Sequence, residues 1–108
     1  MAKILYTVRT TCVSVQQRGR YLSWLVPDHV MAVKAAGAEG VRVVLPDLAK
    51  DDVRAVVEVQ YVFPSRQAFD TYGRDHAPAL RADLLKNFPP GADLALERQV
   101  AEIASELE

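Results

Sequence analysis

Cysteine is almost absent from this sequence, which has one cysteine, Cys12, in 108 residues. A single cysteine excludes an internal disulfide and is typical of proteins in a reducing compartment, so we expect a cytoplasmic location. Cys12 lies within a strand pattern, where a buried, inert thiol is expected more often than a reactive nucleophile.

Long apolar runs and clusters of one charge sign are also missing. Uncharged runs such as Tyr21 to Pro27 are far shorter than the about 20 residues that a helix needs to cross a bilayer. The N-terminal residues enter a strand pattern without a signal-peptide pattern. There is no basic tract, and 13 basic against 14 acidic residues give a net charge of −1. We therefore expect neither a membrane nor a nucleic-acid partner.

Several motifs that would identify an enzyme or a metal site do not occur. The sequence has no glycine-rich phosphate loop, no nucleophile elbow and no close pair of carboxylates suited to acid–base chemistry. Its two histidines, His29 and His76, are far apart and have no cysteine cluster beside them. We therefore predict no metal site and no cofactor, with haem ligation by one histidine as a minor alternative.

The most informative segment that the sequence does contain runs from Val53 to Phe63. It alternates with a period of two and is rich in β-branched and aromatic residues, which predicts a strand. One face of this strand is apolar and requires a helical layer over it. The apolar face consists of Ala55, Val57, Val59, Tyr61 and Phe63; the other face is mixed and consists of Arg54, Val56, Glu58, Gln60 and Val62.

Similar patterns define the remaining elements. Further strands are predicted at Ile4–Val13, Gly40–Leu45 and Asp93–Ala101, although the last of these, with its acidic tail, could also be helical. Helical regions are predicted from Ser14 to Gly37 and from Ser65 to about Phe88, the second interrupted at Asp75-His76-Ala77-Pro78. Loops are expected at Pro46–Asp52 and at Pro89-Pro90-Gly91.

The first helical region has a predicted buried stripe and a predicted break. Pro27 lacks a backbone donor, so it should kink the helix or split it after Val26. Trp24 and Met31 lie opposite the stripe at 3.6 residues per turn. The stripe consists of Leu22, Leu25, Val26, His29, Val33 and Ala36; the corresponding apolar positions before Phe88 are Leu80, Leu84, Leu85 and Phe88 itself.

The element order βαββαβ predicts an α+β, ferredoxin-like fold over residues 1–108 as a single domain. In this fold a four-stranded antiparallel sheet carries both helical regions on one face, and the first and third strands are central. The other face bears no helices and has mixed polarity. It could remain in water, or it could pack on a second copy and leave a polar-lined space between the sheets.

Three segments of the sequence resemble a small bacterial family known only as a domain of unknown function. These segments read ILYTV, YLSWLVPDHVMAVKAAG and VQYVFPSRQAFDTYGRDHAPALRADLLKNF. The resemblance is most specific at HAPALR and at the strand that ends in Pro-Ser, and the sequence departs from the family pattern at Pro27. It implies membership of the dimeric α/β-barrel superfamily, in which two sheets pair back to back, and it implies no assigned reaction. That superfamily includes cofactor-independent monooxygenases acting on polyketide-like quinols, haem-degrading enzymes and lactone isomerases.

The two histidines are the candidate catalytic residues. His29, on the buried stripe, is either a neutral core residue bonded to a backbone carbonyl freed at Pro27, or a pocket residue that acts as a base or contacts a ligand. His76 follows Asp75 at the helix break. It either caps or packs against the loop before Pro78, or it is a partner of His29 or of a bound acid.

A second group of candidates lies mainly on the helix-free face. The charged and polar side chains there could form salt bridges within an interface or anchor an acidic ligand. Trp24 could be half-exposed packing, a subunit contact or a pocket wall. The predicted ligand-lining residues are Trp24, Arg9, Arg42, Glu58 and Gln60.

These observations support three functional hypotheses. The first is a small-molecule-binding protein that works as a homodimeric α/β barrel, paired through the helix-free sheet face and taking a small organic ligand. The second is an enzyme, either a cofactor-independent monooxygenase or an isomerase acting on a cyclic organic acid or quinol. The third is a structural or regulatory interaction module. An enclosed pocket containing His29 would favour the second hypothesis, whereas a solid, salt-bridged sheet face with both histidines bonded to the backbone would favour the third.

Overall fold

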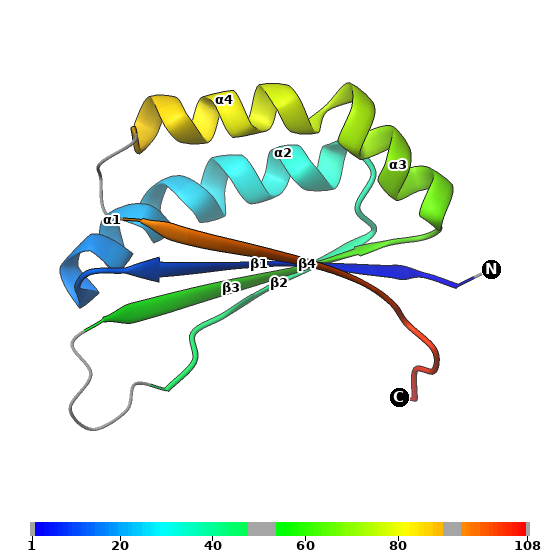
Figure 1. Ribbon diagram of the computed structural model, residues 1–108, viewed down its shortest axis with the longest axis horizontal. Coiled ribbons are helices and arrows are strands. Elements are labelled where there is room, and N and C mark those ends of the chain that lie inside the picture. Colours follow the sequence, from blue (N-terminus) through cyan, green and yellow to red (C-terminus); the bar gives the residue numbers. More distant parts are fainter. Residues whose placement is uncertain (1, 48–53, 90–93, 108) are drawn as a thin grey trace.

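The computed structural model describes residues 2–47, 54–89 and 94–107, in which four strands form one antiparallel sheet. The strands lie in the order β2-β3-β1-β4, and the helices cover one face of the sheet (Figure 1). This topology confirms the ferredoxin-like prediction, with the first and third strands central. The strands are β1 (Ile4–Cys12), β2 (Gly40–Val44), β3 (Ala55–Phe63) and β4 (Ala95–Glu102); the α-helices are α1 (Val15–Trp24), α2 (Val30–Ala35), α3 (Arg66–Asp75) and α4 (Ala77–Asn87).

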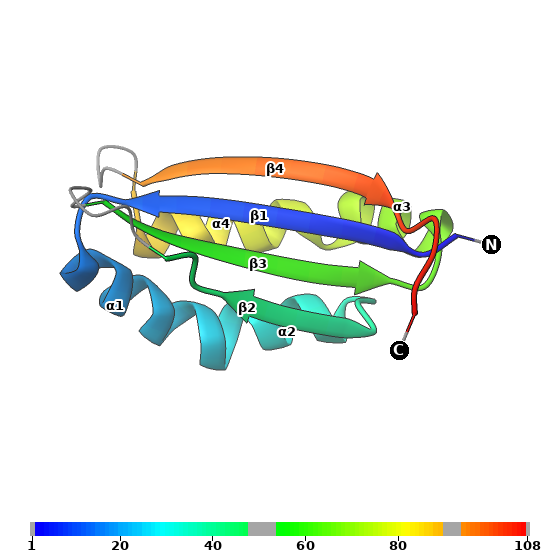
Figure 2. The same ribbon diagram turned by 90° about the horizontal axis from the view of Figure 1, so that it is seen from below.

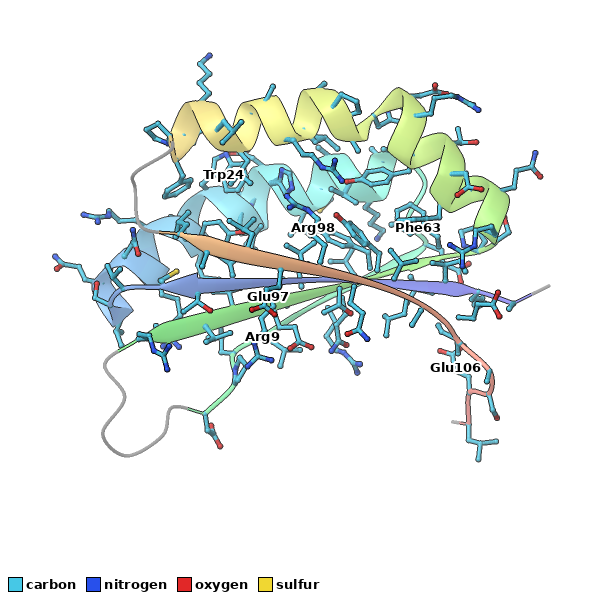
Figure 3. The ribbon with its side chains drawn as sticks, viewed as in Figure 1. Arg9, Trp24, Phe63, Glu97, Arg98 and Glu106 are labelled. Atoms are coloured by element: carbon cyan, nitrogen blue, oxygen red, sulfur yellow. The ribbon has the colours of Figure 1, made fainter. Side chains whose placement is uncertain are left out.

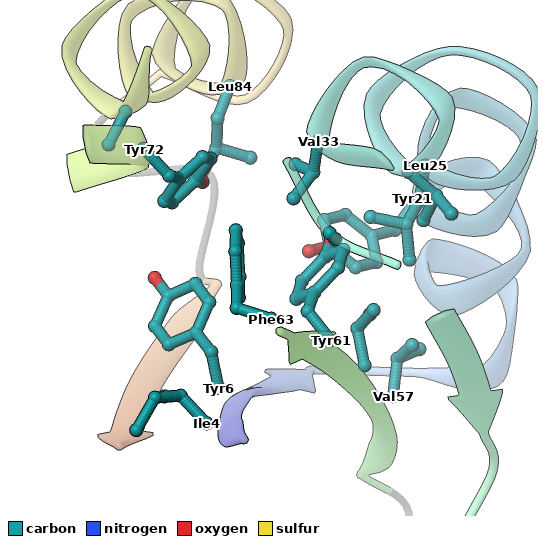
Figure 4. Close-up of a cluster of buried hydrophobic side chains, with 14 of the residues drawn as sticks. Ile4, Tyr6, Tyr21, Leu25, Val33, Val57, Tyr61, Phe63, Tyr72 and Leu84 are labelled. Carbon is teal, nitrogen blue, oxygen red and sulfur yellow. The ribbon is translucent and has the colours of Figure 1, made fainter. Parts of the chain in front are cut away.

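The alternation predicted for the central strands is confirmed. Every second residue of β3 from Ala55 to Phe63 is buried under the helices, and the residues between them are partly exposed on the helix-free face. In β1, Ile4 and Cys12 mark the ends of the corresponding buried row. The core forms where these rows meet side chains of both helical regions, including Leu25 and Leu84 (Figure 4).

A π-helical turn joins α1 to α2 at the place where Pro27 predicted an interruption. This turn, η1, spans Leu25–His29 and is closed by the N–H of Val30, which donates to the carbonyl of Leu25. The wider turn accommodates the missing N–H of Pro27, and the helical path continues instead of splitting. The helix then ends before Gly37, whose positive φ of 131° suits glycine.

Two predictions about this region are wrong, one because the π-helical turn shifts the helical phase after Leu25 and the other because Trp24, which precedes this turn, packs on the rings of Tyr21 and Phe88. Val26, expected in the buried stripe, is 47% exposed, whereas Val30 is buried. Trp24, expected opposite the stripe, is instead half-buried against the core. Met31 is exposed, as predicted.

The second helical region has the predicted cap and break. The Ser65 hydroxyl accepts a hydrogen bond from the N–H of Ala68 at 3.1 Å, and Ser14 caps α1 in the same way. His76 separates α3 from α4. The expected burial of Leu85 is wrong, since it is 52% exposed.

The last predicted strand is confirmed, and its helical alternative is not. β4 pairs with β1 along its length, and residues 103–107 of the tail are not helical. The N–H of Ile103 donates to the carbonyl of Lys3 at 2.9 Å. The tail then crosses the helix-free side toward β2 (Figures 1 and 2). The predicted loop at Pro46–Asp52 lies only partly within the described residues, and the predicted turn at Pro89-Pro90-Gly91 lies almost wholly outside them.

Candidate functional site

A small cavity lies between the sheet and the helical layer, and we name it the His29 cavity. Its volume is about 30 Å³, and it is bordered by side chains of the sheet, of the α1–η1 region and of α4. Its lining combines apolar side chains with a similar number of side chains that carry polar groups. The polar lining consists of His29, Arg81, Arg98 and the tyrosines Tyr6, Tyr21, Tyr61 and Tyr72.

His29 occupies the last position of the π-helical turn. Its Nδ1 is buried and has no hydrogen-bond partner among the described residues, so this atom does not make the backbone hydrogen bond that one interpretation required. The imidazole stacks on Trp24 with the ring centres 4.7 Å apart. Burial lowers the pKa of His29; Asp83 raises it in part and Arg98 lowers it further. The imidazole is therefore neutral near pH 7 and has an unused nitrogen.

Tyr21, Tyr61 and Tyr72 are neutral hydrogen-bonding groups of the cavity. Burial raises the pKa of Tyr72 to about 12 and raises that of Tyr61 further. The Tyr21 hydroxyl lies 3.0 Å from the hydroxyl of Thr10, and both side chains are buried. Burial also raises the pKa of Tyr21. At neutral pH these phenols keep their protons and offer donors to the cavity.

Arg98 reaches the cavity from the edge strand. It is in register with Val8 of β1, on the side of β4 that faces the helices, and Figure 3 shows its side chain on that side. Glu97 lies on the opposite side of the sheet. Sequence analysis missed Arg98. The residue could have been identified because it is the one charged member of an otherwise apolar alternating series, Leu94, Leu96, Arg98 and Val100.

The predicted ligand-lining residues of the helix-free face lie together as a polar band across the sheet. Arg9 Nη1 is 3.3 Å from Glu58 Oε2, and Glu97 lies in register on the other side of Arg9. Arg42 donates twice to Gln60 Oε1, at 3.0 and 2.6 Å, and Gln60 donates to Glu58 at 2.8 Å. An open hollow of about 380 Å³ lies over part of this band.

Trp24 lies apart from the polar band and borders a third hollow, which we name the outer groove. The outer groove has a volume of about 450 Å³, and one of its walls is Phe88, whose ring meets Trp24 edge-on at 5.7 Å. Trp24 therefore separates the groove from His29, on which it stacks. The groove is lined by Gln17, Arg20, Trp24, Asn87 and Phe88.

The other sequence candidates lie elsewhere. His76 is exposed at the junction of α3 and α4, does not line the His29 cavity and makes no side-chain capping bond to α4. Arg54 is exposed and immediately precedes β3. Cys12 is buried, as predicted, and burial raises the pKa of its thiol, which favours the inert form.

Neither a metal cluster nor a membrane span is found in residues 2–47, 54–89 and 94–107. No three histidine, cysteine or acidic side chains lie close enough there to hold an ion together. None of the helices in these ranges has both the length and the apolar character needed to cross a bilayer.

The fold and the cavity define a ferredoxin-like α+β protein with a helix-free sheet face and a small polar cavity under its helices. The chain belongs to the family described as a domain of unknown function, DUF4286, whose model matches residues 3–100. No reaction is assigned to this family. A search of curated proteins found no significant match.

Several solved structures share the fold at low sequence identity. A dimeric ferredoxin-like protein from an uncultured marine organism is 13% identical, with a TM-score of 0.61 and coverage of 99% of this chain and 100% of the other. A Bacillus cereus protein named as a candidate antibiotic biosynthesis monooxygenase is 12% identical, with a TM-score of 0.69 and coverage of 100% and 99%. SnoaB, a cofactor-independent oxygenase from Streptomyces nogalater, is 13% identical, with a TM-score of 0.60 and coverage of 99% and 98%. At these identities the likeness establishes the fold alone.

Proposed function

We propose that this protein binds a small organic molecule in the His29 cavity and works as a homodimer paired through its helix-free sheet face. The observation on which the binding proposal rests is the buried Nδ1 of His29, an atom without a partner among the described residues, on a side chain that lines a cavity with several donors. A buried polar atom without a partner is costly and uncommon in a folded protein, and a bound ligand is one way in which such an atom gains its partner.

The helix-free face has the composition and size of a subunit interface. Its outer rows contain partly exposed apolar side chains, including Leu5, Val56 and Val62, on either side of the polar band. Four strands of up to nine residues cover roughly 19 Å by 30 Å. Because side chains make this face uneven, its accessible area exceeds the flat area and approaches the roughly 800 Å² that each partner buries in a standard interface. Leu107, in the tail on this side, is 95% exposed and would be covered by a second copy.

Charge also favours pairing of two copies. The polar band contains the guanidinium of Arg9 between the carboxylates of Glu58 and Glu97. A two-fold-related copy presents the same surface, so a suitable rotation places opposite charges against one another. Similar solved structures include proteins described as dimeric and ferredoxin-like, which supports this arrangement.

The dimer is tested by light scattering on two matched variants. Leu5→Glu places a charge on the helix-free face, and Leu85→Glu places the same charge on the exposed side of α4. We expect wild type and Leu85→Glu to have twice the chain mass at micromolar concentration, and Leu5→Glu to have the mass of one chain with its circular dichroism retained. A wild-type monomer at every concentration would rule out the dimer.

Ligand binding is tested by a thermal-shift screen with anionic, neutral and cationic organic compounds. A ligand at about 100 times its Kd stabilises the folded state by about 2.7 kcal/mol, which is readily detected. His29→Gln should abolish the shift, while His76→Gln, which changes the exposed histidine, should retain it. Compounds that stabilise wild type and His29→Gln equally would place binding outside the cavity.

The alternative function is catalysis by a cofactor-independent monooxygenase or an isomerase on a cyclic organic acid or quinol. A neutral His29 is suited to act as a base, and some proteins with this fold are named as oxygenases. At about 30 Å³ the cavity encloses neither a quinol nor any other whole ring, so either function requires most of the ligand to lie outside it. Oxygen uptake with a ligand from the screen, lost in His29→Gln, would establish the enzyme instead. A dimer with no ligand at all would indicate an interaction module.

A further inference from the structure

We infer that the His29 cavity and the outer groove together bind a small planar organic acid, with its acid group in the cavity and its ring in the groove. This inference rests on the proposed small-molecule function and names the ligand class.

The electrostatic character of the cavity favours an anion. Arg81 and Arg98 bring two positive charges to its lining, and no carboxylate of the described residues lines it. In the described part of the chain, neither arginine forms an ion pair with an acidic side chain. His29 and the protonated tyrosines add neutral donors. A carboxylate would gain charge-assisted hydrogen bonds that the protein itself leaves unmade.

The size of the cavity matches an acid group and excludes the rest of a ligand. Since one water needs about 10–15 Å³ by this measure, the cavity of about 30 Å³ has room for about two waters. A carboxylate replaces two waters with its two oxygens. The rest of the molecule must lie outside, where the outer groove offers about 450 Å³.

The wall between the two spaces favours a flat ring. It consists of Trp24, which stacks on His29 and borders the groove, and Phe88, which packs edge-on against Trp24. Trp24 ends α1 where the π-helical turn begins, and Phe88 follows the last residue of α4. For a ligand to occupy both spaces, the side chains of Trp24 and Phe88 must rotate aside, and this rotation is part of the inference. Once moved, they offer aromatic faces and edges to a planar ring.

The inference is tested with benzoate as the probe, by NMR titration of the His29 ring protons, with His76 as the internal reference. A ligand of this size should bind with a Kd of roughly 1 mM. Arg98→Met, which keeps the side-chain stem and removes the charge, should weaken binding about tenfold or more. Benzamide, the neutral analogue, should bind the wild-type protein about tenfold or more weakly than benzoate does. Arg9→Met, the matched control on the polar band, should bind benzoate as wild type does.

The possible failures are distinguishable. If benzoate does not bind but a neutral compound from the screen perturbs His29, the acid inference is overturned and the proposed function stands. If Arg9→Met weakens benzoate binding and Arg98→Met does not, the acid binds on the helix-free face and the inference is again overturned. If no compound of any class perturbs His29, both proposals fail. Thermal unfolding of Arg98→Met, whose altered residue is exposed, verifies that the variant remains folded.

Discussion

The buried hydrogen bond between Thr10 and Tyr21 allows a quantitative test of how β1 and α1 form one wall of the His29 cavity. The two hydroxyls are 3.0 Å apart, and the residues are 0% and 2% exposed. Tyr21→Phe leaves the Thr10 hydroxyl in the core without this partner, and Thr10→Val does the same to Tyr21. Each single substitution should cost about 1–3 kcal/mol, because a buried polar group loses its partner.

The double variant should be more stable than the sum of the single effects predicts. Removing both hydroxyls keeps the shape of the core and leaves no unsatisfied group, so the loss should be below about 1 kcal/mol. The coupling energy between Thr10 and Tyr21 is then at least about 1 kcal/mol. Urea unfolding followed by circular dichroism measures it, at one protein concentration because dimerisation contributes to stability.

Thr11→Val supplies the control for this cycle. Thr11 is adjacent to Thr10 but lies on the helix-free face and is only partly buried. Its substitution should change stability by no more than about 0.5 kcal/mol. If the losses of unfolding free energy in the two single variants simply add in the double variant, there is no coupling. This result would refute the hydrogen bond and the contact of β1 with α1 that it makes in the cavity wall.

Three further predictions concern the helices and the core. Because burial holds the pKa of His29 below its unfolded value of about 6.5, stability should be full above that pH and decline below it; His29→Gln should reduce this decline. Fluorescence of Trp24, the only tryptophan, should report the same titration, since protonated imidazole quenches a stacked indole, and a curve unchanged by His29→Gln would contradict the assignment. Ser65→Ala should cost about 1 kcal/mol in thermal unfolding by removing the cap of α3. Val57→Ala should cost about 2 kcal/mol, whereas Val26→Ala, at a 47% exposed site, should be nearly neutral; equal losses in urea unfolding would show that the assigned burial is wrong.

The strands could be predicted from sequence because the phase of a strand hardly drifts. Side chains alternate between two faces, so an apolar residue at every second position from Ala55 to Phe63 fixes which face is buried. The same holds for β1. The element order then selects the ferredoxin-like topology from the few arrangements that short, right-handed connections permit. The fold therefore followed from local patterns and general rules of chain connection.

The composition of the cavity could be predicted only in part. His29 stood out because a titratable ring occurs in an apolar helical stripe, and the structure places it against the cavity. Its polar neighbours Arg81 and Arg98 come from α4 and β4. These residues are so far from His29 in the sequence that no helical or strand periodicity relates them to it. Only the pairing of β4 with β1 brings Arg98 into register with Val8 and so toward the helices.

The π-helical turn explains both the failed helical prediction and the arrangement of the site. Buried positions advance by four residues from Gln17 to Tyr21 and Leu25, and then by five to Val30. The extra residue in this turn restores the apolar stripe after Pro27, so that Val30 takes the core position expected for Val26 or His29. His29 is thereby displaced to the margin of the core, where it meets Trp24 on one side and the cavity on the other. Pro27 interrupts the helical period, and the turn that accommodates it places a neutral histidine between Trp24 and the His29 cavity, where a ligand-binding group is useful.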